Sequence, residues 1–165
     1  MLLTIFLGIV FCAAITLLLI SGVAYVQNEK FFSSAPKEAQ ELIRPRNEEL
    51  FYGARTMGWV MMIMSILMII GVGADAIRDG FRSGYSFTDF FLRFVTIFTI
   101  YKLYDMVFFD WFLLCRFHFF QYYYPETESA ITGRTYGFNI KSQLLKLFVI
   151  FPAASALAAW VCTLL

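Results

Sequence analysis

Long apolar segments constrain this chain more than any other feature. Four of them, at residues 2–26, 57–77, 87–115 and 144–165, are long enough to cross a lipid bilayer, for which a helix needs about 20 mostly apolar residues. The first contains no charge and lacks the positively charged start of a signal peptide, so we expect it to be a retained span. The sequence therefore predicts an all-α, four-helix transmembrane bundle, with residues 1–165 forming one membrane domain.

The composition agrees with burial in lipid. Apolar residues make up 60% of the chain and charged residues 15%, against about 45–50% and about 25% in soluble domains. The net charge is only +1, so we expect the lipid bilayer, and no nucleic acid, as a partner. The three cysteines are scattered and His118 is the single histidine, so neither a metal site nor a bound cofactor is predicted.

Lysine and arginine are unevenly distributed among the loops. Residues 27–55 hold five, residues 116–142 hold three, and residues 78–86 hold two. The positive-inside rule therefore places the first and third loops in the cytoplasm and both termini on the other side of the cell membrane. Within the first loop, the stretch SSAPKEAQELI has capping serines followed by apolar residues at helical spacing. It predicts a short amphipathic helix at the membrane interface.

Ionisable residues interrupt the third span. Lys102 lies near its midpoint and Asp105 follows one turn later, at a depth where a charge costs at least about 2.5–3.5 kcal/mol. Because they are three residues apart, we expect them to form an ion pair facing the bundle interior or a water-filled cavity. On an α-helical wheel, Asp89, Arg93 and Asp110 share the roughly opposite face. Four helices would leave one polar face uncovered, so we expect a homo-oligomer.

More charges gather where the second span ends and the third begins. Asp89 and Arg93 are four apart, which predicts an ion pair, and Gly71 and Gly73 would let the second span unwind before Asp75. One interpretation is a solvated rim of ion pairs. The other is a vestibule that guides an ion or polar solute inward. The candidate polar path then comprises Lys102, Asp105, Asp110, Arg93, Asp89 and Asp75.

Asp110 lies near the expected cytoplasmic edge of the third span. It is either a charge at the membrane rim or part of a cytoplasmic-side site. The candidate residues of that site are Arg116, His118, Tyr122, Arg46 and Asn47.

Two resemblances follow from short motifs. The stretches YDMVFFDW, PETE and YGF resemble those of uncharacterised small bacterial four-span membrane proteins, which implies no particular activity. RPRNEE at residues 44–49, with Arg116, Tyr122 and Tyr123, is similar to the membrane-associated eicosanoid and glutathione metabolism superfamily. That resemblance implies four helices and a trimer holding glutathione between subunits. The family usually has an acidic residue three positions after its Asn, where this chain has Leu50.

Three functions remain open from the sequence. The first is a small oligomeric transporter or channel with a polar path past Lys102 and Asp105, because ionisable groups at mid-bilayer mark such paths. The second is a membrane-embedded enzyme acting on a lipophilic substrate, with glutathione as its cofactor if the second resemblance holds. The third is an accessory subunit of a larger membrane complex, in which the buried charges pair with charges of the partner.

Overall fold

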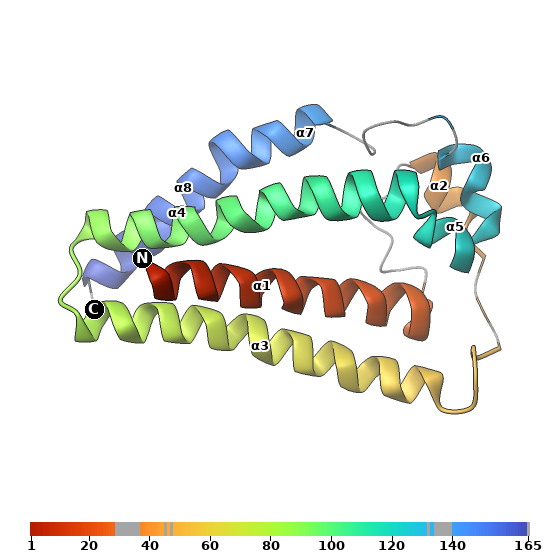
Figure 1. Ribbon diagram of the computed structural model, residues 1–165, viewed down its shortest axis with the longest axis horizontal. Helices are drawn as coiled ribbons and strands as arrows, with labels where there is room; N and C mark the ends of the chain where they lie inside the picture. The colour runs from red at the N-terminus through yellow and green to blue at the C-terminus, as the bar shows by residue number, and fades with distance from the viewer. Residues whose placement is uncertain (29–36, 45, 47, 132, 134–139, 165) are drawn as a thin grey trace.

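The described part of the chain is mainly helical. The computed structural model describes residues 1–28, 37–44, 46, 48–131, 133 and 140–164, and these ranges contain no strand. Long helical rods make up the bundle (Figure 1), and three of the four join an α-helix to a π-helical segment. The rods are α1 (Leu2–Ile20) with η1 (Ser21–Val26); α3 (Ala54–Arg82); α4 (Phe87–Tyr104) with η3 (Asp105–Arg116); and α7 (Ile140–Leu145) with η5 (Lys146–Ile150) and α8 (Phe151–Leu164).

Among the described residues, three helices are long and apolar enough to cross a membrane, namely Leu2–Val26, Ala54–Arg82 and Lys141–Leu164. They indicate a membrane-embedded protein. The rod formed by α4 and η3 is equally long but carries more charge. The second predicted span is longer than expected at both ends. Its helix continues through Gly71 and Gly73 without a break, so the predicted unwinding there is wrong.

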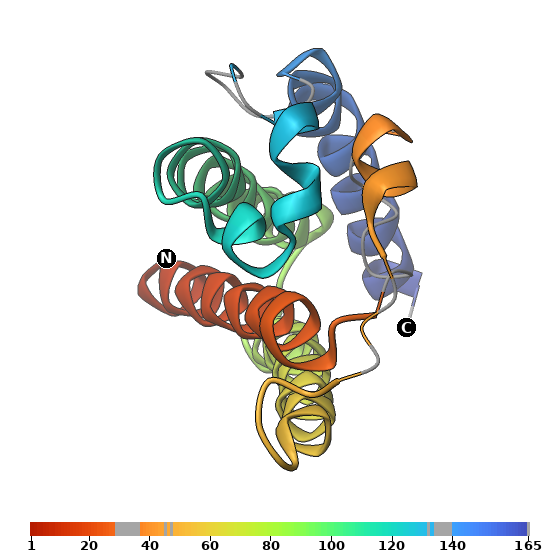
Figure 2. The ribbon, with the colours of Figure 1, turned by 90° about the vertical axis from the view of Figure 1, so that its right-hand side faces the viewer.

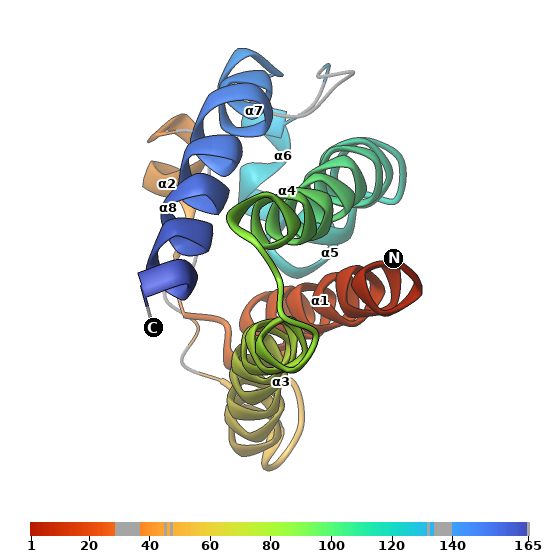
Figure 3. The same cartoon turned by 90° about the vertical axis from the view of Figure 1, so that its left-hand side faces the viewer.

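Successive rods run in opposite directions, so α1 and α4 are parallel to each other (Figure 1). Both termini lie at one end of the bundle, the terminal end (Figure 1). Viewed along the rods, α1 lies between α3 and α4, whereas α8 packs mainly along α4 (Figures 2 and 3). The opposite end carries four short helices that we call the cap. They are α2 (Lys37–Leu42), α5 (Phe119–Tyr123), η4 (Pro125–Thr127) and α6 (Glu128–Ile131).

The cap includes the helix predicted at the membrane interface. Only its part from Lys37 onward lies within the described residues. Ala39 within the helix is 2% exposed, and Ile43, which directly follows the helix, is 8% exposed. Ile43 packs in a cluster with Val23 and Tyr124. The apolar side of this helix is therefore buried against protein.

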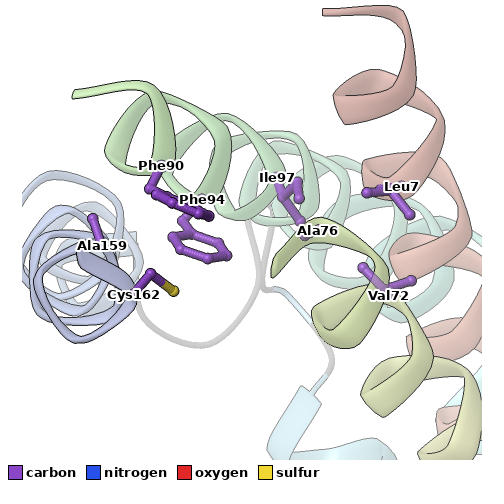
Figure 4. Packing of buried hydrophobic residues seen from close by; sticks show 8 residues of the cluster. All are labelled: Leu7, Val72, Ala76, Phe90, Phe94, Ile97, Ala159 and Cys162. Atoms are coloured by element: carbon purple, nitrogen blue, oxygen red, sulfur yellow. The ribbon is translucent and has the colours of Figure 1, made fainter. Parts of the chain in front are cut away.

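An apolar core closes the terminal end. Side chains from all four rods meet there (Figure 4): Leu7, Val72, Ala76, Phe90, Phe94, Ile97, Ala159 and Cys162. Phe90 and Phe94 stack with ring centroids 6.1 Å apart. Phe90 approaches α3 at Gly80, where a Cβ atom would lie 2.3 Å from the ring. Only glycine allows this contact, which leaves little space between α3 and α4 at this end.

Candidate functional site

A partly open cavity of about 880 Å³ lies in the cap-side half of the bundle. Its walls come from all four rods, and the cap covers it through residues of α2, α5, η4 and α6. Much of its surface is apolar: Ile15 and Leu18 come from α1, Met62 and Ile66 from α3, and Phe151 from α8. The volume falls within the range of about 300–1,000 Å³ that is typical of sites for small molecules.

Three ionisable residues of the third predicted span, Lys102, Asp105 and Asp110, line one side of this cavity. Lys102 Nζ donates a hydrogen bond to Asp105 Oδ2, which confirms the predicted ion pair. The two side chains are 3% and 16% exposed. The ammonium is therefore almost enclosed, and the carboxylate is the more accessible member of the pair.

Asp110 lines the same cavity through a contact between two rods. Gln143 Nε2 of α7 donates to Asp110 Oδ2 at 2.6 Å. Gln143 Oε1 is buried, and no described residue hydrogen-bonds to it. Lys146 also lines the cavity, but its side chain is exposed, and no ion pair joins a described cation to Asp110. The carboxylate thus has an amide donor but no ion-pair partner among the described residues.

The helix geometry explains why Asp110 joins the pair. An α-helical wheel places Asp110 nearly opposite Asp105, which predicted that the two carboxylates lie on different faces of the rod. That prediction is wrong. From Asp105 onward the helix is π-helical, so each backbone hydrogen bond joins residues five apart, as from Phe117 N to Phe112 O at 2.8 Å. In this geometry residues five apart, such as Asp105 and Asp110, lie nearly one above the other. Both carboxylates therefore face the same cavity.

The two other π-helical segments of the rods also line the cavity. Gly22 and Val23 belong to η1, and Lys146 and Ile150 belong to η5. π-Helical turns are rare and occur frequently at functional sites. Their convergence supports the cavity as the functional site by a criterion that does not depend on charge.

Arg93, by contrast, belongs to a separate cluster at the terminal end. It is 4% exposed. Its guanidinium donates to Ala76 O at 2.9 Å and to Tyr85 Oη at 2.5 Å, and it pairs with Asp79 at 2.7 Å. It also lies 4.3 Å from the centroid of the Tyr85 ring. These contacts tie α4 to α3.

The predicted pair between Asp89 and Arg93 is wrong. Asp89 forms a capping box with Ser86 at the start of α4, accepting from Ser86 N at 3.0 Å and Oγ at 2.6 Å. Asp75 is exposed on α3. Asp75, Asp89 and Arg93 do not line the cavity, so the candidate path divides into a cavity group and a terminal-end group.

A single chain covers both polar faces of this rod. Arg93 and Lys102 are 4% and 2% exposed without a second subunit. The argument that an oligomer is needed to bury them therefore does not hold, and the homo-oligomer stays a prediction.

The candidate cytoplasmic-side residues are spread over the cap end. Arg46 pairs with Glu126 at 2.7 Å and lies 5.4 Å from the centroid of the Tyr124 ring, which joins the first loop to the cap. Arg116 lies 5.7 Å from the Trp111 ring centroid. Two further candidates, His118 and Tyr122, are exposed, and Asn47 lies outside the described residues. Within the described ranges, no cluster of potential metal ligands occurs.

Comparison of the chain with models of known protein families, with curated proteins and with solved structures found no significant match. The functional argument therefore depends on the cavity itself.

Proposed function

We propose that the chain is a four-span integral membrane protein in which α4 and η3 form the additional span. Its length supports this, because residues 87–116 form a helix about 40 Å long, comparable to the neighbouring rods. Its most costly charges, Arg93 and Lys102, are buried within the chain, as intramembrane charges usually are. By the positive-inside rule, the cap faces the cytoplasm, and both termini lie outside.

We propose further that the cavity belongs to a transporter that takes up a small amphipathic solute and exchanges protons. The observation that carries this proposal is the placement of Lys102, Asp105 and Asp110 on one wall of a large cavity within the bundle. The apolar core closes the terminal end, and the cavity lies toward the cap, as in a carrier accessible from one side. Carboxylates and lysine in such surroundings exchange protons as their environment changes.

Proton flux into liposomes tests this function. The purified protein is reconstituted with an internal pH-sensitive dye, and a potassium gradient with valinomycin drives proton entry. We expect flux well above that of protein-free liposomes, and loss of flux in Asp110→Asn and in Lys102→Met. The control is Glu48→Gln, which removes an exposed charge outside the cavity. Wild-type flux equal to that of empty liposomes would overturn the transport proposal.

A second candidate is a membrane-embedded enzyme acting on a lipophilic substrate. The observation that favours it is the combination of long apolar walls with ionisable groups in one cavity. If the glutathione resemblance holds, Arg46 and Arg116 would take part in binding that cofactor in a trimer. Glutathione at millimolar concentration should then raise the thermal unfolding temperature of the protein, and an unchanged temperature would count against this candidate.

A further inference from the structure

Two lysines and two aspartates line the cavity, but only Lys102 and Asp105 form an ion pair among the described residues. Lys102 and Asp105 neutralise each other through their ion pair. The Gln143 amide donates a hydrogen bond to Asp110, and no described cation pairs with it. Lys146 of η5 also lines the cavity, but its side chain is exposed and forms no ion pair with Asp110. Asp110 is therefore the carboxylate of the cavity lining that has no ion-pair partner among the described residues.

A carboxylate removed from water is costly unless a positive charge or hydrogen-bond donors compensate it. Gln143 supplies one donor to Asp110, but its own Oε1 is buried without a described partner. The Asp110 carboxylate and Gln143 Oε1 are therefore two hydrogen-bond acceptors on side chains that contact each other. A ligand with a positive charge and several N–H donors would satisfy both.

The remaining lining suits such a ligand. Four aromatic residues line the cavity, Tyr101, Phe109, Phe120 and Phe151. The faces of aromatic rings attract cations, with greater strength where water is excluded. The aliphatic wall from α1 and α3 offers a surface for a hydrocarbon tail.

We infer that the cavity binds a lipophilic amine in its protonated form, with the ammonium group at Asp110 and Gln143 Oε1 and the alkyl tail along α1 and α3. This inference names the solute class of the proposed transporter and rests on that function for its biological role. The binding itself is measurable without transport.

Calorimetric titration of the protein in phosphatidylcholine nanodiscs tests the inference. The probes are decylamine, decanol and decanoate, which share a chain length and differ in the head group, and empty nanodiscs provide the blank. At neutral pH we expect saturable binding of decylamine alone. Asp110→Asn should weaken it at least tenfold, whereas Glu48→Gln should leave it unchanged.

A second variant keeps the test informative if Asp110→Asn does not fold. Gln143→Met removes the unpaired acceptor together with the amide donor to Asp110. Loss of the donor affects both cationic probes, so decylamine should weaken several-fold relative to decyltrimethylammonium, which has no N–H donor for the lost acceptor. Equal binding of decylamine and decanol, tighter binding of decanoate, or normal decylamine binding by both variants would overturn the inference.

The two proposals fail in distinguishable ways. Saturable decylamine binding without proton flux supports the lipophilic amine and overturns transport. Proton flux without saturable decylamine binding supports transport and overturns the lipophilic amine.

Discussion

The ion pair in the cavity wall gives the sharpest energetic prediction. Removing one member of a buried pair leaves an uncompensated charge and typically costs about 3–5 kcal/mol. The Lys102 side chain is 3% exposed and that of Asp105 is 16% exposed. Asp105→Leu strands the enclosed ammonium, so we expect a cost of about 4 kcal/mol, within that range. Lys102→Met leaves a carboxylate that reaches the cavity, so we expect about 2 kcal/mol, since water there compensates part of the charge.

The double variant Lys102→Met/Asp105→Leu completes the cycle. It leaves no uncompensated charge, so its cost should be about 3 kcal/mol smaller than the sum of the two single costs. The free energy of unfolding is measured by circular dichroism as the fraction of sodium dodecyl sulfate in mixed micelles increases. Equal costs for the two single variants, or additive costs in the double variant, would refute the asymmetric pair.

Two further predictions concern backbone packing and the cap. Gly58→Ala should destabilise the fold by about 1–3 kcal/mol through overpacking, because its Cβ would lie 2.7 Å from Tyr25 Cβ. The control is Gly73→Ala, whose Cβ meets no atom within 4 Å. It should be neutral or stabilising in the same sodium dodecyl sulfate titration. A harmless Gly58→Ala would contradict this contact. Burial raises the pKa of Tyr124 from 10.0 to about 12, so its contribution to stability is complete below pH 10 and is lost as the pH rises through 12. An ultraviolet titration should lose one late-ionising tyrosine in Tyr124→Phe, and an unchanged curve would argue against burial.

Much of the fold could be predicted because helix formation and lipid burial leave local signals. The start of the first span at residue 2 and its end at residue 26 match the helical rod. The pair of Lys102 and Asp105 was also predictable, because three-residue spacing places both on one side of a helix.

The rest of the site depends on features that spacing does not encode. The transition to π-helix at Asp105 changes the direction in which Asp110 points, and the spacing of an ideal α-helix does not anticipate that transition. Gln143 contacts Asp110 from a rod 33 residues away. Its only sequence signal is an amide at the start of an otherwise apolar segment.

Arg93 shows how tertiary contacts override local spacing. Its neighbour at four residues, Asp89, is held by the capping serine, and the guanidinium instead pairs with Asp79 across the interface between α4 and α3. Pairing across rods requires knowledge of which helices are adjacent.

The central claim is that the wall bearing Lys102 faces a water-accessible cavity within the membrane. Two single-cysteine variants test this claim. Tyr101 lines the cavity, whereas Leu103 is 50% exposed on the outer surface. The two positions lie at nearly the same depth, about 3 Å apart along the helix. Both variants are made after the three native cysteines are replaced by serine, and both are treated in proteoliposomes with a charged methanethiosulfonate reagent that needs water to react. The account predicts modification of Tyr101→Cys and protection of Leu103→Cys; protection of both, or equal modification of both, would contradict it.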